Sequence, residues 1–472
     1  MRYSALLTDL YELTMLAGYF EHGMHEDDAS FDLFFRANPF KGGYAVFAGL
    51  EPALRYLEQV RFTEQDLAYL DSLNLFRPRF LDYLEGFRFR CKVIAPDEGT
   101  VVFANEPLVT IEGGLAQAQL VETVLLNIIN FQTLVATKAA RIQHAAGDGE
   151  VVEFGLRRAH GPDGGLGGTR AACVGGVRCT SNTWAGQIFG IPVQGTHAHS
   201  WVMAFDDELT AFRAYAEVFP DNAVLLVDTY DTLRIGIPNA ITVAGELRKK
   251  GHELKGVRLD SGDLAYLSRR ARKMFDEAGF PDVRIVASNE LDEYVIQSLR
   301  SEGSRIDIYG VGTQLATAGG EGGGALGGVY KLVRFADKPR LKVTQDIAKA
   351  TLPDRKRLLR LVDAAGTFIQ DVICREGENL EPGATVYDPT NPSQRRRLEK
   401  TFDAVEIRRV VMEKGQIVGD LPDLKNCADH RVEQFRRLPE GTLRLHNPHT
   451  YKISISPQLH ELRERLMEKI MF

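Results

Sequence analysis

The sequence has few cysteines, little excess charge and no long apolar run, and each absence excludes a class of protein. Its five cysteines form no C-x-x-C pair in 472 residues, which favours reduced thiols and a cytoplasmic location over a secreted disulfide scaffold. The formal net charge is −7, so neither nucleic acid nor an anionic membrane is expected as a partner. No apolar run approaches the ~20 residues that span a bilayer, and no signal peptide is expected.

Two nucleotide-binding motifs are also missing. The stretch Gly310-Val311-Gly312-Thr313 has no G-K-[ST] after its second glycine, which excludes a Walker A loop. It also lacks the third glycine of G-x-G-x-x-G, so no dinucleotide-binding fold is expected. Any phosphate group would have to be bound by a local cluster of residues.

The composition, 44% hydrophobic and 26% charged, is typical of a soluble chain long enough for two domains with substantial cores. In residues 1–145, short strand-like stretches, such as residues 29–36, alternate with helical ones, such as residues 63–83. Apolar residues at helical spacing predict one long buried helix over residues 116–144. We expect an N-terminal α+β domain with an antiparallel sheet and a long connecting helix.

From residue 151 the pattern changes to short apolar runs separated by helix-like stretches. Most successive runs start ~30 residues apart, the length of one βαβ step. Parallel strands with helical crossovers favour an α/β barrel or a doubly wound sheet over residues 146–345. Residues 346–472 are expected to pack back on the N-terminal domain and the barrel. The runs are 151–154, 191–193, 223–227, 256–259, 283–287 and 307–311.

Polar or glycine residues follow each of these runs. In parallel α/β proteins the active site lies outside the carboxyl ends of the strands, so these residues are expected to gather at one site. Each pair could by itself be an ordinary turn or helix cap. A shared site also explains the arginines and histidines. The residues are Arg157 and Arg158, Thr196 to His199, Asp228 and Thr229, Asp260 and Ser261, Ser288 and Asn289, and Gly310 to Thr313.

The segment Gly195-Thr196-His197-Ala198-His199-Ser200-Trp201 follows the second run. Histidines two positions apart project to the same side of an extended segment and could face one ligand. Three interpretations stay open: a hydrogen-bonded brace, a metal site, and a histidine that accepts phosphate. His252 is the only later histidine in the barrel region. This scarcity of further ligands weakens the interpretation as a metal-dependent hydrolase.

Candidate anion-binding residues lie in three of the loops. Arg157 and Arg158 precede a glycine-rich loop, and guanidinium groups match phosphate or carboxylate bidentately, although a solvated pair is the alternative. Ser288 and Asn289 are expected to open a helix whose amides and hydroxyl could hold phosphate, or simply form a cap. Gly312 and Thr313 lie in a late loop of the barrel, where phosphate sites commonly form.

Two aspartates, Asp228 and Asp260, are candidate ligands of Mg²⁺, which usually takes one or two carboxylates, waters and substrate phosphates. Arg258 precedes Asp260 by two positions, so both should face the same way along a strand. This Arg–Asp pair could be structural, or it could present a guanidinium group to a small carboxylate ligand.

A series of ordered motifs covers most of the chain. They are TDLYELTM (8–15), EFGLRRAHGPDGG (153–165), TSNTWAGQIFGIPVQGTHAHSW (180–201), VDTYD (227–231), GVRLDSGDL (256–264), ASNELDE (287–293), GVGT (310–313), GGVYKL (327–332) and LPEGTLRLHNP (438–448). In these motifs the chain closely resembles the nicotinate phosphoribosyltransferase family. Eight or more motifs in order are far more specific than any one of them.

The resemblance implies a type II phosphoribosyltransferase fold, which is an irregular α/β barrel with an N-terminal α+β domain. It implies a homodimer with active sites at the interface. The implied reaction joins nicotinate to phosphoribosyl pyrophosphate, giving nicotinate mononucleotide and pyrophosphate in NAD salvage. ATP would be a co-substrate, as in an ATP-dependent ligase, and Mg²⁺ would assist.

The resemblance also assigns roles to residues. His199 would be transiently phosphorylated, while Thr196 and Arg258 would line the nicotinate pocket together with Tyr11, lent across the dimer. The phosphoribosyl and phosphate groups would be held by Arg157, Arg158, Ser288, Asn289, Gly312 and Thr313. Some bacterial relatives carry an acidic residue just after the phosphorylated histidine, where this chain has Ser200. The group that orients His199 is therefore open.

Two alternatives accompany this interpretation. A related enzyme could use nicotinamide in place of nicotinate, or quinolinate, although quinolinate enzymes are markedly shorter. A catalytically silent ligand-binding protein on the same scaffold belongs to a different class, and the presence of His199, Arg258 and the arginine pair argues against it.

Overall fold

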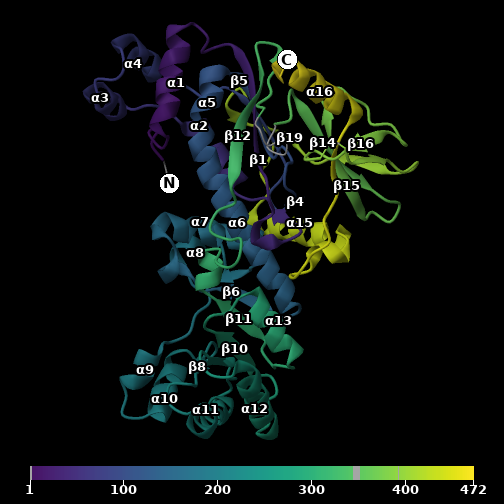
Figure 1. Cartoon of the computed structure of the whole chain (residues 1–472). Coiled ribbons are helices and arrows are strands. Elements are labelled where there is room, and N and C mark those ends of the chain that lie inside the picture. The colour runs from purple at the N-terminus through teal and green to yellow at the C-terminus, as the bar shows by residue number, and fades with distance from the viewer. Residues whose placement is uncertain (1–2, 344–350, 392, 472) are drawn as a thin grey trace. The chain divides into compact units, whose positions relative to one another are not determined.

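The chain divides into two compact units, and the second is inserted into the sequence of the first (Figure 1). The second unit comprises residues 135–324, and the first comprises the residues on either side of it. The predicted domain boundary at residue 345 lies outside the described residues. The computed structural model describes residues 3–343, 351–391 and 393–471.

The first unit is built on a seven-stranded sheet in the order β13-β12-β1-β5-β3-β19-β20, with antiparallel pairing throughout. Strands from both ends of the chain therefore share one sheet. The antiparallel sheet expected in the N-terminal region is confirmed. The strands are β1 (Asp28–Phe35), β3 (Lys92–Ala95), β5 (Val109–Gly114), β12 (Gly328–Phe335), β13 (Lys338–Pro339), β19 (Arg409–Glu413) and β20 (Gln416–Ile417); β2 (Ala45–Val46) and β4 (Val101–Val102) pair separately.

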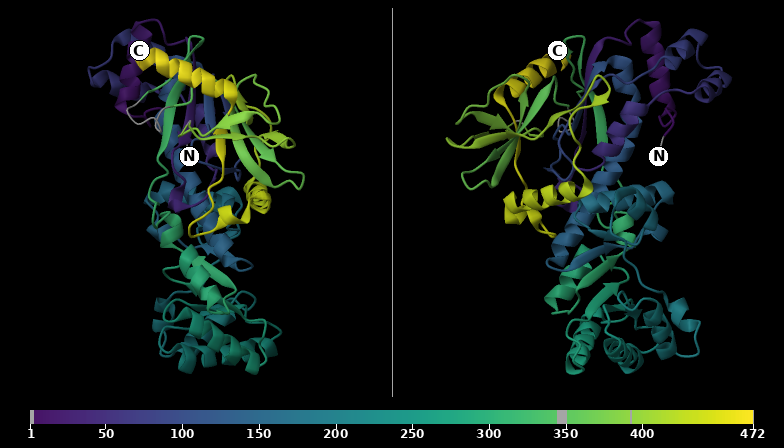
Figure 2. Two further views of the ribbon diagram at one scale, coloured as in Figure 1. Left: turned by 45° about the vertical axis from the view of Figure 1, so that its right-hand side comes forward. Right: turned by 180° about the vertical axis from the view of Figure 1, so that it is seen from behind.

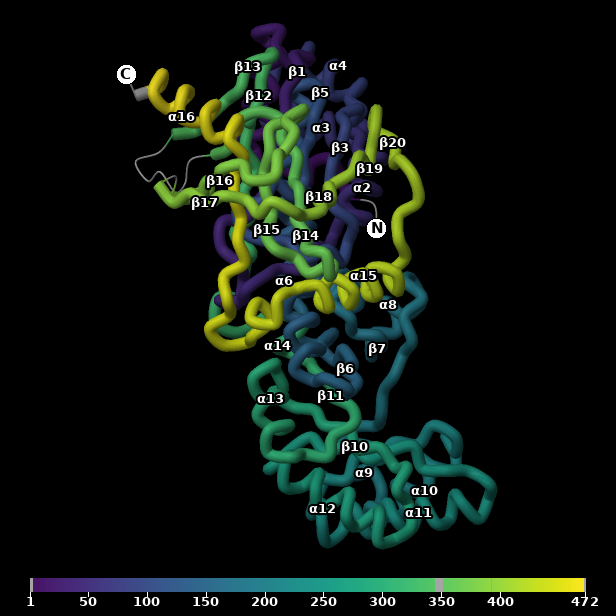
Figure 3. Tube along the Cα trace, turned by 90° about the vertical axis from the view of Figure 1, so that its right-hand side faces the viewer, coloured from purple at the N-terminus to yellow at the C-terminus, as the bar shows by residue number. Residues whose placement is uncertain are grey.

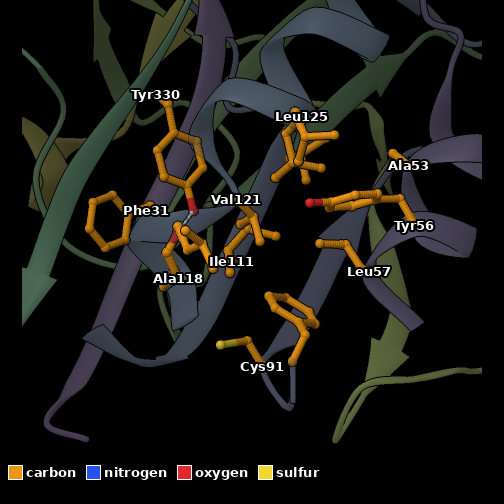
Figure 4. Close-up of a cluster of buried hydrophobic side chains, with 14 of the residues drawn as sticks. Phe31, Ala53, Tyr56, Leu57, Cys91, Ile111, Ala118, Val121, Leu125 and Tyr330 are labelled. Carbon is orange, nitrogen blue, oxygen red and sulfur yellow. Dashed lines mark hydrogen bonds between the residues drawn. The ribbon is translucent and has the colours of Figure 1, made fainter. Parts of the chain in front are cut away.

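Side chains along β1 point alternately to the two faces of the sheet, and this explains how the sheet packs. Phe31, Leu33 and Phe35 are buried in one core cluster, as their shared face predicts. The ring of Phe31 stacks on that of Tyr330, with centroids 4.9 Å apart, and the Tyr330 hydroxyl donates to the Ala118 carbonyl at 2.6 Å (Figure 4). The polar end of this buried tyrosine is thus satisfied.

Two of the expected helices are each divided in two. Residues 63–83 form α3 and α4, and residues 116–144 fall in α5 and α6, with a break at Val121. The apolar spacing alone gives no sign of these breaks. The helices are α1 (Leu10–Glu21), α2 (Leu50–Gln59), α3 (Glu64–Ser72), α4 (Pro78–Glu85), α5 (Leu115–Leu120) and α6 (Glu122–Ala146).

The C-terminal residues of the first unit form a six-stranded sheet in the order β17-β16-β21-β15-β14-β18. Helix α16 (Pro457–Met471) contacts β15 and β16 of this sheet, as Figure 2 shows. The remaining elements are β14 (Lys356–Val362), β15 (Phe368–Arg375), β16 (Thr385–Tyr387), β17 (Arg395–Arg397), β18 (Asp403–Glu406), β21 (Ile453–Ile455) and α15 (Leu424–Arg437).

The second unit holds a six-stranded sheet in the order β7-β6-β11-β10-β9-β8, in which every pair is parallel. Helices follow its strands, and α11, α12 and α13 can be traced in Figure 3. The α/β class is confirmed. The strands are β6 (Glu150–Glu153), β7 (Cys179–Thr180), β8 (Val224–Leu226), β9 (Gly256–Leu259), β10 (Arg284–Ser288) and β11 (Ile308–Val311); the helices are α7 (Gly161–Val174), α8 (Thr183–Phe189), α9 (His199–Met203), α10 (Glu208–Val218), α11 (Ile237–Lys249), α12 (Leu264–Glu277), α13 (Glu293–Ser301) and α14 (Thr313–Ala316).

One of the six predicted strands is wrong. Residues 191–193 make only an isolated parallel bridge, between Val193 and Thr180. The strand that pairs with β6 is instead β7, which is two residues long and carries too short a pattern to be recognised. The other five runs are strands with nearly the predicted bounds.

Throughout the described parts of the chain, every helix is too short or too polar to cross a membrane.

The carboxyl group of Glu12 anchors α1, the helix that carries Tyr11. It is fully buried and accepts hydrogen bonds from the backbone N–H and the hydroxyl of Thr123, at 2.9 and 2.7 Å, and from Thr8. Burial nevertheless raises the pKa of Glu12 to about 7, because removing the carboxylate from water outweighs these bonds.

The pKa of Glu12 predicts a loss of stability as the pH rises. Between about pH 4.5 and pH 7 the unfolded chain releases this proton while the folded chain keeps it. The free energy of unfolding should therefore fall across this range, by up to about 3 kcal/mol for this group. Denaturant titrations at several pH values would measure it, with Glu12→Gln as the matched variant. An identical pH dependence in both proteins would contradict the prediction.

Candidate active site

A pocket with a volume of about 410 Å³ lies at the carboxyl ends of the strands of the second unit. Residues that follow β6, β7, β10 and β11, the end of β9 and the segment before α9 all contribute to it. The predicted gathering of polar strand ends is confirmed for this pocket. It is lined by Phe154, Leu156, Arg157, Arg158, Ser181, Gly195, Thr196, Arg258, Asp260, Ser288, Asn289, Glu290, Gly310, Gly312 and Thr313.

The guanidinium group of Arg258 is held from three directions. Its Nε donates to the Ser288 hydroxyl at 2.7 Å, and its two terminal nitrogens donate to the Thr196 hydroxyl at 3.2 Å and to Asp260 Oδ1 at 2.7 Å. The side chain is only 16% exposed. Arg258 and Asp260 do face the same way, as their spacing predicts. A charged fork with this many fixed partners is preorganised for an anion.

Asp260 is ionised in this setting. Burial opposes ionisation, but the hydrogen bond from Ser288 and the charge and hydrogen bond of Arg258 hold the pKa of Asp260 below its usual value. Its backbone N–H donates to Asp228 Oδ2 at 2.8 Å, and the Ser261 hydroxyl donates to the same oxygen at 2.6 Å. The two predicted metal ligands are therefore neighbours, although Asp228 does not line the pocket.

Phe154 forms an aromatic wall that the sequence did not reveal as functional. The guanidinium carbon of Arg258 lies 5.7 Å from its ring centroid, which is within cation–π range. The ring occupies space that Gly310 leaves, because a Cβ atom at that glycine would lie 2.5 Å from two ring carbons. Gly310 thus serves packing, whereas its motif had suggested only a phosphate loop.

Arg157 and Arg158 lie in a short 3₁₀ turn, Leu156–Arg158, at the rim. Both are exposed. The backbone N–H of Arg158 donates to the Gly155 carbonyl at 2.8 Å, but within the described ranges neither guanidinium group has a hydrogen-bond or carboxylate partner. Their charge is therefore not neutralised by the protein.

The prediction that Ser288 and Asn289 open a helix is wrong. Helix α13 begins at Glu293, and its N-cap is Asp292, whose carboxylate accepts from two backbone N–H groups. Asn289 and Glu290 instead adopt left-handed backbone conformations, with φ of 81° and 45°. This costs energy for residues other than glycine. Ser288 and Asn289 still line the pocket, as do Gly312 and Thr313 before and within α14.

The two histidines do not share a face, contrary to the prediction from their spacing. His199 begins α9, so the extended geometry ends at Ala198. Its ring is 40% exposed, with Nδ1 3.1 Å from the Thr229 hydroxyl and Nε2 3.8 Å from Asp260 Oδ2. Thr229 and Asp260 are thus the groups beside the ring, and Ser200 is not needed for that purpose. Only the position of Thr229 after a strand had pointed to it.

His197 is buried and neutral. Its Nε2 accepts the backbone N–H of Leu226 at 3.2 Å, so the ring proton is on Nδ1, which lies 3.4 Å from the Ala198 carbonyl. Burial lowers the pKa of His197 to about 4, and the charge of Arg258 adds to this. This arrangement is the hydrogen-bonded brace among the three interpretations of the segment.

Glu153 organises the end of β6, a role that sequence reasoning missed. Its carboxylate is buried and accepts from the Thr180 hydroxyl at 2.6 Å, the Thr169 hydroxyl at 3.2 Å and the Gly155 backbone N–H. It therefore joins β6, β7 and α7 beneath the pocket. A glutamate at the end of an apolar run is too common a pattern to have revealed this.

One predicted site residue belongs to the first unit. Tyr11 belongs to α1 of the first unit and is 45% exposed. Among the residues that the structure describes, no three histidine, cysteine or acidic side chains form a group able to hold a metal ion.

Comparisons with known proteins agree along the whole chain. Three family models described as nicotinate phosphoribosyltransferase match the chain. The N-terminal domain model matches residues 6–130, the family model matches residues 150–357 and the C-terminal domain model matches residues 355–463. The nicotinate phosphoribosyltransferase of Bacillus subtilis (strain 168) is 43% identical, covering 99% of this chain and 97% of the relative. Nicotinate phosphoribosyltransferase pncB2 of Mycobacterium tuberculosis (strain H37Rv) is 44% identical, covering 84% of each.

A solved structure shows the same fold. The crystal structure of human nicotinic acid phosphoribosyltransferase has a TM-score of 0.87 and 33% identity, covering 97% of this chain and 99% of the human one. A nicotinate-nucleotide pyrophosphorylase from Pyrococcus furiosus, with a TM-score of 0.72 and 23% identity, covers 92% of this chain and 95% of its own and shares the fold.

Proposed function

The chain belongs to the nicotinate phosphoribosyltransferase family, and we propose that it joins nicotinate to phosphoribosyl pyrophosphate with hydrolysis of ATP. The products are nicotinate mononucleotide and pyrophosphate. The fold and the family membership are shown by the comparisons. The assignment of substrates to particular residues rests on the chemistry of the pocket.

The observation that carries the proposal is the fixed guanidinium group of Arg258. A guanidinium has five N–H donors, and Ser288, Thr196 and Asp260 occupy three of them. The other two have no acceptor in the parts of the chain that the structure describes, and they face a pocket with an aromatic wall. The carboxylate of nicotinate matches these donors and carries the opposite charge. The amide of nicotinamide offers a neutral group that would be bound less well.

The phosphate groups are assigned to the arginines at the rim. As the ring nitrogen of nicotinate forms its bond to the anomeric carbon, the bond to pyrophosphate breaks and the electron pair leaves with the phosphate oxygen. Arg157 and Arg158, whose charges are not neutralised, would stabilise that departing charge together with Ser288, Asn289 and Thr313. Little proton transfer is needed, so positioning and charge account for the catalysis.

Mg²⁺ fits the acidic residues beside the pocket. Asp228 Oδ1 is buried without a hydrogen-bond partner, and a magnesium ion needs only one or two carboxylates because water and substrate phosphates complete its shell. Asp228 and Asp260 would hold it. When bound, it would neutralise part of the pyrophosphate charge.

His199 is proposed to accept the γ-phosphoryl group of ATP, releasing ADP, and water then hydrolyses the phosphohistidine to inorganic phosphate. Its ring is accessible and has Thr229 and Asp260 as neighbours. The buried ring of His197 has no nitrogen free, so it is unsuited to this role. The added charge and acceptor oxygens would order neighbouring loops around the substrates.

Two further properties are proposals of the same kind. A homodimer would allow Tyr11 of the partner chain to complete the nicotinate pocket, and the exposure of Tyr11 is compatible with this role. A cytoplasmic location is supported by the five cysteines, which are all buried and form no disulfide.

The substrate assignment predicts a clear preference in a direct assay. The protein is incubated with phosphoribosyl pyrophosphate, Mg²⁺ and either nicotinate or nicotinamide, with and without ATP, and mononucleotide and ADP are measured. We expect nicotinate mononucleotide as the product, with ADP formed alongside it. Equal or better use of nicotinamide would contradict the assignment, and the absence of both products would favour a catalytically silent protein.

Arg258→Ala should weaken the binding of nicotinate. A hydrogen bond to a charged group contributes roughly 1.5–3 kcal/mol, so we expect the KM for nicotinate to rise about 10- to 100-fold. Steady-state kinetics would measure it, with Arg213→Ala as the control, since Arg213 pairs with Glu246 away from the pocket. An unchanged KM would remove Arg258 from the nicotinate site.

His199→Ala should separate the two activities. We expect ATP hydrolysis to be lost and slow synthesis without ATP to persist, because the groups that bind both substrates remain. The matched control is His252→Ala, which removes a surface histidine paired with Asp221. If His199→Ala hydrolysed ATP like the unaltered protein, another residue would be the phosphate acceptor.

A further inference from the structure

The irregular segment of residues 192–197 lies between the two edge strands of the parallel sheet, β7 and β8. On one side the Thr180 N–H donates to the Pro192 carbonyl at 3.1 Å, and the Gln194 N–H donates to the Thr180 carbonyl at 2.9 Å. On the other side the contact to β8 is made by a side chain, because the Leu226 N–H donates to His197 Nε2. A histidine ring thus occupies the place of a strand carbonyl.

The ring of His197 is fixed by its surroundings. Leu226 is 1% exposed, so its N–H has no access to water and needs this acceptor. The ring meets that of Tyr215 edge-on, with centroids 4.8 Å apart, and lies near Phe212 on the same helix, α10. His197 therefore joins the segment to both the sheet and the helix that covers it.

The positions of two residues, Thr196 in the pocket and His199 beside it, depend on this attachment. Thr196 donates its hydroxyl proton to the His197 carbonyl at 3.1 Å and accepts from Arg258 at 3.2 Å with the same oxygen. His199, two residues further on, begins α9 and lies against Thr229, which follows β8. Movement of His197 away from β8 would shift both residues against the guanidinium group and the neighbouring strand end.

We propose that His197 is a positioning residue, whose neutral ring replaces a strand in the sheet and thereby sets the places of Thr196 and His199. It touches no substrate and acts through these two neighbours. The proposal rests on the proposed nicotinate phosphoribosyl transfer, because the kinetic constants of that reaction are among its readouts.

Three substitutions separate the hydrogen bond from the bulk of the ring. His197→Gln can place a carbonyl oxygen near the position of Nε2, whereas His197→Asn reaches only as far as Nδ1. His197→Phe keeps the ring against Tyr215 and removes the acceptor. We expect the Gln variant to stay within about threefold of the original KM for nicotinate, and the Asn and Phe variants to raise it about tenfold or more. The His199-dependent ATP hydrolysis should likewise fall little in the Gln variant and strongly in the Asn and Phe variants.

A second measurement reads the hydrogen bond without activity. Hydrogen exchange of the peptide that contains Leu226 should be slow in the original protein and in the Gln variant, and fast in the Asn and Phe variants. The control is Trp201→Phe, which removes the hydrogen bond from Trp201 Nε1 to the Ala211 carbonyl, between α9 and α10, and leaves β8 untouched. It should change neither the exchange nor the KM.

The outcomes are distinct. The proposal would be overturned if His197→Phe kept the original KM for nicotinate and the slow exchange at Leu226. It would also be overturned if His197→Gln raised the KM and the exchange rate as much as His197→Phe does. Equal effects from Trp201→Phe would show general loosening of the helices and would also overturn it. If the unaltered protein makes no nicotinate mononucleotide, the proposed function fails, while the exchange measurement still decides whether His197 holds β8.

Discussion

The hydrogen bonds of one guanidinium group hold the pocket together. Arg258 lies on β9, and the parallel register places it opposite Val286 of β10, so that Asp260 and Ser288 follow on the same face of the sheet. The same group reaches Thr196 and faces the Phe154 ring. Ser288 is fixed by its pairing with β11, and Asp260 by the hydrogen bond from its backbone N–H to Asp228. The orientation of the cation is therefore set before a ligand binds, and holding it costs little on binding.

The arginines that line the pocket differ in how firmly the protein holds them. At its centre, the arginine expected to meet a carboxylate is held in place by protein groups. At the rim, Arg157 and Arg158 are exposed and without protein partners among the described residues, so their long side chains keep their conformational freedom. Under the proposed assignment, a small planar substrate would be recognised by a rigid site, while larger phosphate groups would meet side chains that can adapt to them.

The sequence predicted the features that depend on local pattern and failed where contacts distant in the chain decide. Strands with clear apolar runs and the Arg258–Asp260 pair followed from spacing alone. The two-residue strand β7 and the left-handed conformations at Asn289 and Glu290 depend on neighbours elsewhere in the chain. The separation of His197 from His199 had the same cause: a helix starts at the second histidine, and the first is drawn to the N–H of Leu226. The roles proposed for the site residues were suggested by the family resemblance and are supported by the chemistry of the pocket, and no spacing rule could have provided them.

The insertion of one unit into the other also fixes an order of events during synthesis. Strand β1 is made early, but its partner β12 follows the whole second unit along the chain, and β19 comes later still. The second unit has all six strands of its sheet once residue 311 has been made. It can therefore fold while β1 and β3 still lack their pairing partners β12 and β19, and while Phe31 lacks the ring of Tyr330. Until ribosomal elongation delivers the missing strands, the nascent chain carries unpaired strand edges that favour aggregation, and these edges are paired in the finished protein.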